Sequence, residues 1–407
     1  MNSSGYLTAK EAAAELGITL STLYSYVSRG LIRSEVADES KRTHRYRRED
    51  VESLKARQEQ RLNPAKAVED ALHWGTPVME SSITLIVDNR LYYRGHDVVE
   101  LAQTQPVEGV AALIWAGDPL AAVAGLLEPA GEPFSPLLQA IALQVSHLPP
   151  VDKFQILLPL AGVDDLAAYD LRPEAVAQTG ARILHLLVTL AVNGLIPQKN
   201  MAVQLQQRWA ADDPSAAVLI NAALILCADH ELNVSSFTAH CVASAGATPY
   251  QAVIAGLAAL QGVKHGRSTE RVEAFLNEAQ AARQVEAAVA ARLKRGEGIP
   301  GFGHPLYPAG DPRGQYLLNL LTTHYPYTPT IKLAEQITEA ALALIGERPN
   351  IDFGLTVLAR ALNLPAGAPI ALFALGRTIG WIGHIIEQYQ LDRIIRPRAR
   401  YVGELPK

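Results

Sequence analysis

Residues 216–226 read Ala216-Ala217-Val218-Leu219-Ile220-Asn221-Ala222-Ala223-Leu224-Ile225-Leu226, and this stretch favours a helix. Its apolar positions recur at the spacing of a helix instead of alternating as they do in a half-buried strand. The same texture extends from about Glu108 to Leu293, with few alternating runs. We therefore expect a mainly helical body.

One segment ahead of this helical region follows the other pattern. Residues 83–93 alternate apolar and polar side chains on both sides of Asp88-Asn89. A period of two on either side of a short polar turn is typical of two paired strands. We expect a small β-hairpin there.

The composition limits the class of protein. At about 100–200 residues per domain, 407 residues allow two or three domains. A hydrophobic share of 49% with 19% charged residues excludes disorder for most of the chain. Cys227 and Cys241 cannot form a disulfide framework and lack zinc-ligand spacing, so we expect a reducing compartment and no metal. The longest apolar stretch, 183–196, is interrupted and too short to span a membrane, and residues 1–5 lack a signal pattern. We expect a cytoplasmic protein.

Residues 1–61 differ in charge from the rest of the chain. They hold eleven Lys and Arg against nine Asp and Glu, which leaves the remainder with the excess of negative charge. Five of the eight residues 41–48 are cationic, a density that suits a polyanionic partner. A polar helix ends at Pro64, where Ala- and Leu-rich sequence begins, so we expect a domain boundary near 61–64.

These first residues also carry the pattern of a helix-turn-helix. Thr8 and Glu11 fit a capping box that starts a short helix. Gly17 permits a left-handed turn, and Thr19 is placed to cap a second helix. A third helix is expected to start at Arg48.

Most of residues 5–60 resemble the winged helix-turn-helix of the MerR and excisionase type, in the segments 6–13, 21–26 and 45–51. In such modules the second helix enters the major groove and a wing contacts phosphates, and so small a domain binds usefully only within a dimer. The resemblance implies a DNA interface made of Ser21, Thr22, Tyr24, Ser25, Arg29, Arg45, Arg47 and Arg48. Double-stranded DNA is thus an expected partner, and the alternative is a module that binds only protein.

Short segments of the body concentrate His, Arg and Asp beside glycine or proline, where reactive side chains are commonly held. These segments are 230–231, 264–266, 301–304, 311–313, 349–352, 375–378 and 396–398. Taken singly, each has a plain structural explanation. A lone histidine is usually a core or surface residue, and Asp352 after Asn350 fits a helix cap.

Taken together, these segments resemble citrate synthase in order and spacing over nearly all of residues 75–405. The pieces that carry the resemblance are 91–97, 228–233, 263–266, 301–304, 311–313, 349–353, 373–378 and 396–398. The resemblance implies an all-α fold with a large domain at 62–266 and 371–407 and a smaller mobile domain at 267–370, behind a helix-turn-helix domain at 1–61. It also implies a homodimer whose active site lies between domains.

The resemblance further implies the reaction, in which acetyl-CoA or a related acyl-CoA condenses with oxaloacetate to give citrate and CoA without a cofactor. Asp352 would remove a proton from the acyl methyl group and His265 would donate a hydrogen bond to the thioester carbonyl. His304 would polarise the ketone. Substrate binding would fall to His230, Arg313, Arg377 and, from the partner subunit, Arg396.

The residue types suit this chemistry. A thioester C–H is a weak acid, so a carboxylate base suffices only with a donor on the carbonyl oxygen, in a site closed to water. A dianionic substrate calls for several guanidinium groups, whose planar forks match carboxylates and stay charged.

The chain departs from the family beside these residues. After the catalytic histidine the family usually has Gly-Gly-Ala-Asn-Glu, whereas this chain has Gly266-Arg267-Ser268-Thr269-Glu270. Arg267 either lowers the pKa of His265, contacts a different substrate or obstructs the acyl group. Residues 305–308 are Pro-Leu-Tyr-Pro in place of Arg-Val-Tyr-Lys, which removes two cations near the CoA-binding loop, and 354–356 are Gly-Leu-Thr in place of Tyr-Ser-Gly.

Three functions stay open on the sequence alone. The first is condensation of acetyl-CoA with oxaloacetate, and the second uses a longer acyl group, as in 2-methylcitrate synthase. The third is a transcriptional regulator whose body senses a metabolite by closing around it and so re-spaces two DNA-binding heads on the dimer.

Overall fold

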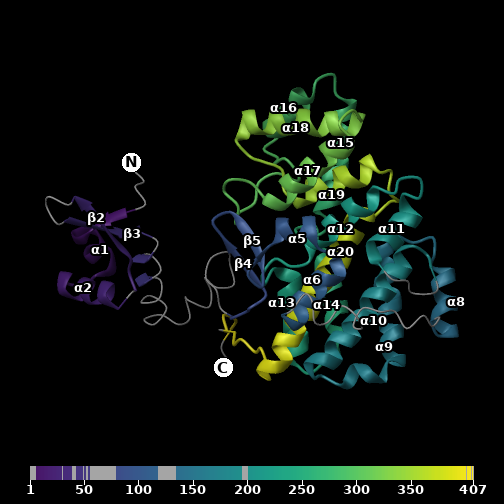
Figure 1. Ribbon diagram of the computed structural model, residues 1–407, viewed down its shortest axis with the longest axis horizontal. Helices are drawn as coiled ribbons and strands as arrows, with labels where there is room; N and C mark the ends of the chain where they lie inside the picture. The colour runs from purple at the N-terminus through teal and green to yellow at the C-terminus, as the bar shows by residue number, and fades with distance from the viewer. Residues whose placement is uncertain are drawn as a thin grey trace. The chain divides into compact units, whose positions relative to one another are not determined.

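The computed structural model divides the chain into two compact units, residues 1–80 and 81–407, which are described separately (Figure 1). It describes residues 6–29, 31–38, 43–48, 50–51, 54–55, 79–117, 134–194, 200–399, 401–404 and 406. Lys41, Arg42 and the boundary predicted at 61–64 lie outside the described residues.

The first unit contains the predicted helix-turn-helix. Its elements are β1 (Tyr6–Thr8), α1 (Ala9–Leu16), α2 (Leu20–Ser28), β2 (Ser34–Asp38) and β3 (Thr43–Arg47), with the antiparallel strands in the order β1-β3-β2. Both halves of the Thr8–Glu11 capping box form, and Thr19 caps α2 through the Thr22 N–H. Gly17 ends α1 at φ +63°. Residues 48, 50–51 and 54–55 are helical, as predicted for a third helix.

The second unit opens with the predicted hairpin. Strands β4 (Thr84–Val87) and β5 (Arg90–Tyr93) pair antiparallel, and β6 (His96–Asp97) joins the far side of β5. Asp88 and Asn89 form the two-residue turn at φ +50° and +60°. Asn and Asp tolerate this left-handed conformation, and it matches the twist of the two strands.

Helices make up the rest of the unit, as expected. They are α5 (Val98–Thr104), α6 (Val107–Ala116), α8 (Pro136–Gln144), α9 (Pro150–Asp164), the 3₁₀ helix η1 (Leu166–Tyr169), α10 (Pro173–Ala191), α11 (Met201–Trp209), α12 (Ala216–Cys227), α13 (Val234–Ser244), α14 (Pro249–Leu260), α15 (Ser268–Ala281), α16 (Val285–Lys294), α17 (Pro312–His324), α18 (Pro329–Ile345), α19 (Ile351–Ala361) and α20 (Ala368–Leu391). The stretch at 216–226 is almost all of α12, and most of its side chains are buried in the core.

Helix α20 runs through the centre of this core and contacts α10, α12 and α13 (Figure 1). Every residue from 370 to 386 is buried. Gly380 lets α20 approach the end of α12, because a Cβ there would overlap the Ala228 carbonyl oxygen that accepts the Gly380 N–H at 3.0 Å. The close approach brings Arg377 up to the turn that carries His230.

By length and composition α20 is apolar enough to cross a membrane, which the sequence prediction did not single out. In the structure 94% of its apolar window is buried inside the protein. Such burial is typical of the core helix of a globular domain.

Candidate active site

Six of the seven predicted catalytic and substrate-binding residues lie in one region of the second unit. His230 follows α12, His265 lies between α14 and α15, and His304 lies between α16 and α17. Arg313 and Asp352 occupy the first turns of α17 and α19, while Arg377 lies inside α20. Turns and helix ends thus supply all but Arg377.

His230 and His304 contact each other edge to face, and both contact Tyr307. Their ring centroids are 5.1 Å apart, and the Tyr307 hydroxyl lies 2.9 Å from His230 Nε2. Burial first, and then the charges of Arg313 and Arg377, lowers the pKa of His230 well below its usual value. His230 is therefore a neutral ring near pH 7.

His304 is held in a defined tautomer. Its Nδ1 accepts the Leu306 N–H at 3.2 Å, so the proton of the neutral ring sits on Nε2. Burial, reinforced by Arg313 and opposed by Asp311, lowers the pKa of His304 to about 4. The ring is thus a neutral hydrogen-bond donor through Nε2.

His265 belongs to a chain of polar groups. Its Nε2 lies 2.9 Å from the Ser235 hydroxyl, which also accepts the Trp381 indole N–H at 3.2 Å. The ring contacts Phe373 at a centroid distance of 5.8 Å. Burial, with a smaller effect of Arg377, lowers the pKa of His265 to about 4.

Arg267 does not produce that shift. Its Nε lies 3.7 Å from Glu270, and 42% of the Arg267 side chain is exposed. The charge that acts on His265 comes from Arg377. Of the three roles considered for Arg267, lowering the pKa of His265 therefore has no support in the structure.

Arg313 and Arg377 are both almost fully buried. Asp311 accepts hydrogen bonds from Nε and Nη2 of Arg313 at 2.9 and 2.8 Å. Nε of Arg377 donates to the Cys227 carbonyl oxygen at 2.9 Å, while its Nη2 has no hydrogen-bond partner among the described residues. A buried guanidinium nitrogen without a partner is a ready site for a carboxylate oxygen.

The Asp352 carboxyl is buried, and its hydrogen bonding is incomplete among the described residues. The Asn350 side chain caps α19 by accepting the Asp352 N–H, so the Asp352 carboxyl is not used as a cap. Its Oδ1 is buried and has no partner among the described residues. Burial raises the pKa of Asp352 to about 6, although Arg313, a hydrogen bond from Ser268 and Arg377 oppose the rise. A carboxylate with this pKa is a stronger base than an ordinary aspartate and still ionised near pH 7.

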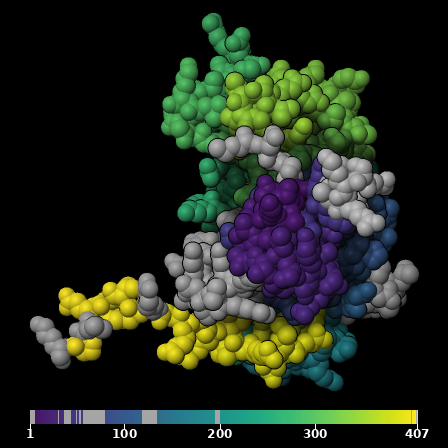
Figure 2. Space-filling view, turned by 90° about the vertical axis from the view of Figure 1, so that its left-hand side faces the viewer, coloured from purple at the N-terminus to yellow at the C-terminus, as the bar shows by residue number. Residues whose placement is uncertain are grey.

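Arg396 lies apart from the other six. It is exposed, in the extended segment that follows α20. Figure 2 shows these C-terminal residues, in yellow, reaching out from the body, and Ile394, Tyr401 and Val402 are 68%, 69% and 83% exposed. Within one chain, Arg396 therefore does not join the site.

Asp229 and His384 form a buried ion pair beside His230. His384 Nε2 lies 3.1 Å from Asp229 Oδ1, and both side chains are fully buried. Burial would raise the pKa of Asp229, but His384 and Arg377 hold it below its usual value, while Asp229 raises the pKa of His384. The pair fixes the residue next to His230.

Several of these supporting residues were missed in the sequence. Asp229 and Asp311 stand inside motifs that carry the resemblance, and Tyr307 and Ser268 stand inside the segments that depart from the family, so their positions carried a signal. Ser235 and His384 gave none, because their partners lie far away in the chain.

The predicted DNA-binding residues lie on α2 and β3 of the first unit or directly after them, since Arg29 follows α2 and Arg48 follows β3. Ser21, Tyr24, Arg29 and Arg45 are exposed, and Tyr24 is 53% exposed. The hydroxyls of Ser21 and Thr22 lie 2.8 and 2.9 Å from the hydroxyl of Thr19, the residue that caps α2.

Two of the three wing arginines pair with carboxylates of the same unit. Arg47 lies 3.4 Å from Glu35 and Arg48 lies 3.2 Å from Glu15. Arg45 has no ion-pair partner within the described part of the chain. These two ion pairs partly neutralise the wing formed by Arg45, Arg47 and Arg48, which is therefore less cationic than its arginines alone suggest.

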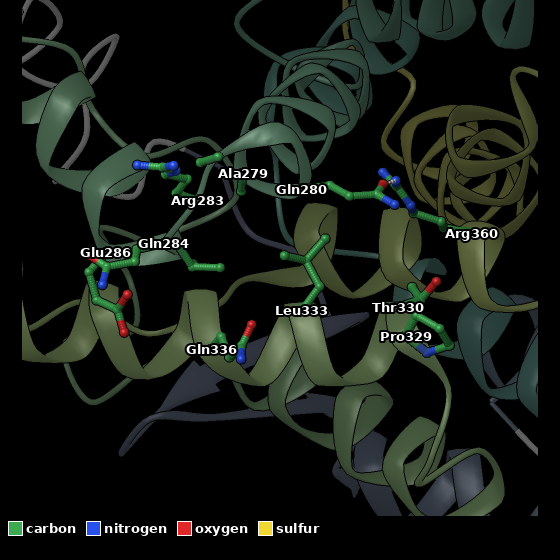
Figure 3. Close-up of a pocket in the computed structure, with 12 residues that line it drawn as sticks. Ala279, Gln280, Arg283, Gln284, Glu286, Pro329, Thr330, Leu333, Gln336 and Arg360 are labelled. Carbon is green, nitrogen blue, oxygen red and sulfur yellow. Dashed lines mark hydrogen bonds between the residues drawn. The ribbon is translucent and has the colours of Figure 1, made fainter.

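A partly open pocket of about 370 Å³ lies away from these residues, between α15, α16 and α18. Figure 3 shows Leu333 of α18 pointing into it and Gln280 of α15 beside Arg360. None of the predicted site residues lines it. In the described ranges, no group of three or more His, Cys, Asp and Glu side chains is arranged to hold a metal ion.

Comparison with known proteins extends these observations. Residues 71–398 match the family model "Citrate synthase, C-terminal domain", and residues 6–59 match "Helix-turn-helix domain". The chain is 29% identical over 365 residues to citrate synthase 2 of Bacillus subtilis, covering 81% of this chain and 94% of the relative. It is 27% identical to 2-methylcitrate synthase 2 of Corynebacterium glutamicum, covering 78% and 89%.

A solved structure agrees with this result. The crystal structure of citrate synthase from Thermotoga maritima superposes with a TM-score of 0.69 at 27% identity, covering 82% of this chain and 95% of that one. The match with the family model takes in the hairpin, the helical core and the six clustered side chains. The chain therefore belongs to the citrate synthase family and carries a helix-turn-helix domain ahead of the family's fold.

Proposed function

We propose that this protein condenses acetyl-CoA with oxaloacetate to give citrate and free CoA. The observation that carries the proposal is the pairing, in one buried site, of Asp352, whose pKa is raised to about 6, with two neutral histidines whose pKa values are about 4. This is the combination that enolisation of a thioester and attack on a ketone require.

The carbon–carbon bond would form in two steps. Asp352 takes a proton from the acyl methyl group, and the electron pair moves to the thioester oxygen as an enolate that His265 stabilises. The enolate carbon then attacks the ketone carbon of oxaloacetate, and the ketone oxygen takes the Nε2 proton of His304. Water finally cleaves the thioester and releases CoA.

The hydrogen bonds of Ser235 bear on the tautomer of His265. The Ser235 hydroxyl donates to the Asn233 carboxamide oxygen at 2.8 Å, so its oxygen is placed to accept the N–H at His265 Nε2. For His265 to donate from Nδ1 to the thioester oxygen, the Ser235 hydroxyl would turn its proton from Asn233 to His265 Nε2.

The two buried arginines would hold the carboxylates of oxaloacetate. Arg377 offers its unpartnered Nη2, and Arg313 offers Nη1, since Asp311 occupies its Nε and Nη2. Bidentate or paired contacts from guanidinium groups suit a dicarboxylate. Arg396 would complete the clamp from the other subunit of a homodimer, which its exposed place on the C-terminal segment favours.

The first unit gives a second candidate function specific support. A helix-turn-helix with exposed Tyr24, Arg29 and Arg45 favours binding to double-stranded DNA. On a dimer, two such domains bind two half-sites. A body that binds a metabolite would then act as a sensor, with or without turnover.

Release of free CoA, detected with a thiol reagent, tests the first function. Purified protein is mixed with acetyl-CoA or propionyl-CoA, with and without oxaloacetate, and Asp352→Ala serves as the control. Release that needs oxaloacetate and disappears in Asp352→Ala supports the enzyme, and a preference for propionyl-CoA moves the assignment to 2-methylcitrate synthase. If a folded protein that binds oxaloacetate releases no CoA, oxaloacetate-dependent affinity for DNA upstream of its own coding region decides for the sensor.

A further inference from the structure

The turn of the hairpin reaches the loop that carries His304. Asn89 Nδ2 donates to the Gly310 carbonyl oxygen at 2.8 Å, and Asn89 Oδ1 accepts the Ala309 N–H at 3.1 Å. One carboxamide thus pairs with two successive residues of a segment far along the chain, below α17 in Figure 1. The contact uses both hydrogen-bonding edges of Asn89, so it defines an orientation as well as a distance.

The loop of residues 303–310 is also held at other points. At its start, the Gly303 N–H donates to the Arg348 carbonyl at 2.9 Å, and Asn350 Nδ2 donates to the Gly303 carbonyl at 3.1 Å. In its middle, Tyr307 bonds to His230. Asn89 supplies the contact at its end, where Gly310 has φ +104°.

The same hairpin also holds the turn that carries His230. Thr84 donates to Asp229 Oδ2 at 2.5 Å, and the Tyr93 hydroxyl lies 3.0 Å from both the carbonyl oxygen and the nitrogen of Asp229. One small sheet therefore bonds to both segments whose histidines face each other at 5.1 Å. The bonds of Asn89 also join the part predicted as the large domain, residues 62–266 and 371–407, to the part predicted as the smaller mobile domain, residues 267–370.

We infer that Asn89 is a positioning residue for the condensation. It fixes the loop of residues 303–310 against the hairpin and so places His304 beside His230. The kinetic test of this inference rests on the proposed function. Its geometry rests on the hydrogen bonds of Asn89 to Ala309 and Gly310. No step of the reaction involves Asn89 itself.

Asn89→Gly is the informative variant. Glycine adopts the left-handed turn freely, so the hairpin keeps its shape while both hydrogen bonds to the loop are lost. We expect kcat/KM for oxaloacetate to fall on the order of tenfold, mainly in kcat, because His304 acts on the ketone in the transition state. The KM for the acyl-CoA should stay unchanged. Asn89→Asp keeps the acceptor for the Ala309 N–H and should lose less.

Two controls separate positioning from general loosening. Asp88→Asn changes the same turn without touching the loop and should leave the kinetics unchanged. Tyr325→Phe removes bonds to Asp213 and Ser215 that cross the same proposed boundary at another place. If Tyr325→Phe lowers kcat as much as Asn89→Gly does, the effect belongs to domain contact in general and the inference is overturned.

A readout without turnover keeps the two proposals distinguishable. Hydrogen exchange at the Ala309 amide should speed up on the order of tenfold in Asn89→Gly, with α17 unchanged. Faster exchange with unaltered kcat/KM overturns the positioning role. If the wild-type protein releases no CoA, only the proposed function fails, and hydrogen exchange then decides: unaltered exchange at the Ala309 amide in Asn89→Gly overturns the inference, and faster exchange supports it.

Discussion

Asp352 combines a proposed catalytic role with a cost in stability. Its carboxyl is buried beside Asp311, and the opposing effects of Arg313, Ser268 and Arg377 do not restore an ordinary pKa. A group whose pKa is raised in the folded state stabilises the fold below its unfolded pKa and loses that contribution as the pH rises through the folded value. For Asp352 the loss runs from about pH 4 to about pH 6.

Asp352→Asn should therefore stabilise the protein while it abolishes CoA release. The amide cannot ionise, so we expect a gain of about 2 kcal/mol in the free energy of unfolding at pH 8 and almost none at pH 4. Urea unfolding at the two pH values measures the difference. A variant that is less stable than wild type at pH 8 would show that the Asp352 carboxylate holds the fold together.

The same carboxyl should set the acid limb of the pH–rate profile. The base works only when ionised, so kcat/KM should rise with pH through an apparent pKa near 6. His265 and His304, with pKa values about 4, are already neutral across that range. Because the Ser268 hydrogen bond lowers the pKa of Asp352, Ser268→Ala should move the limb to higher pH. A limb that Ser268→Ala leaves in place assigns it to another group.

Among the elements, strand β3 gives the sharpest test of the DNA interface. Arg45 is exposed and has no ion-pair partner among the residues described, whereas Arg48 already pairs with Glu15. Arg45→Ala should weaken DNA binding and lower the salt slope by about one, while Arg48→Ala should change the slope less. Fluorescence anisotropy with a duplex over a range of salt concentrations measures both. Slopes that stay at the wild-type value in both variants would remove the wing from the interface.

Local signals account for what the sequence predicted well. Three local features depend only on residues that are close in the sequence, and the structure confirms all of them. They are the helix caps at Thr8 and Thr19, the alternation around Asp88 and the helical run at 216–226. The motifs also located the six residues that gather in the body. Contacts between distant segments were not readable, because Ser235 meets His265, and Asn89 meets Ala309, only after the helices have packed.

At the scale of the whole molecule, the placement of Arg396 predicts complementation between two inactive variants. If Arg396 serves the partner's site, a mixed dimer of Asp352→Asn and Arg396→Ala has one intact site of its two. Equal mixing by unfolding and refolding should restore about a quarter of wild-type CoA release, since half of the dimers are mixed. Absence of any recovery, with mixed dimers verified by mass, would mean that Arg396 acts within its own chain or not at all.

The burial of Cys227 under Arg377 also bears on how the protein can be followed in solution. Burial raises the pKa of the Cys227 thiol to about 12 and also raises that of the partly exposed Cys241. Thiols in this state react slowly, because the thiolate is the nucleophile. In the folded protein a thiol reagent therefore registers the CoA product with little background, while unfolding uncovers both cysteines. The two cysteines therefore report unfolding without an added label, in the same assay that follows CoA release.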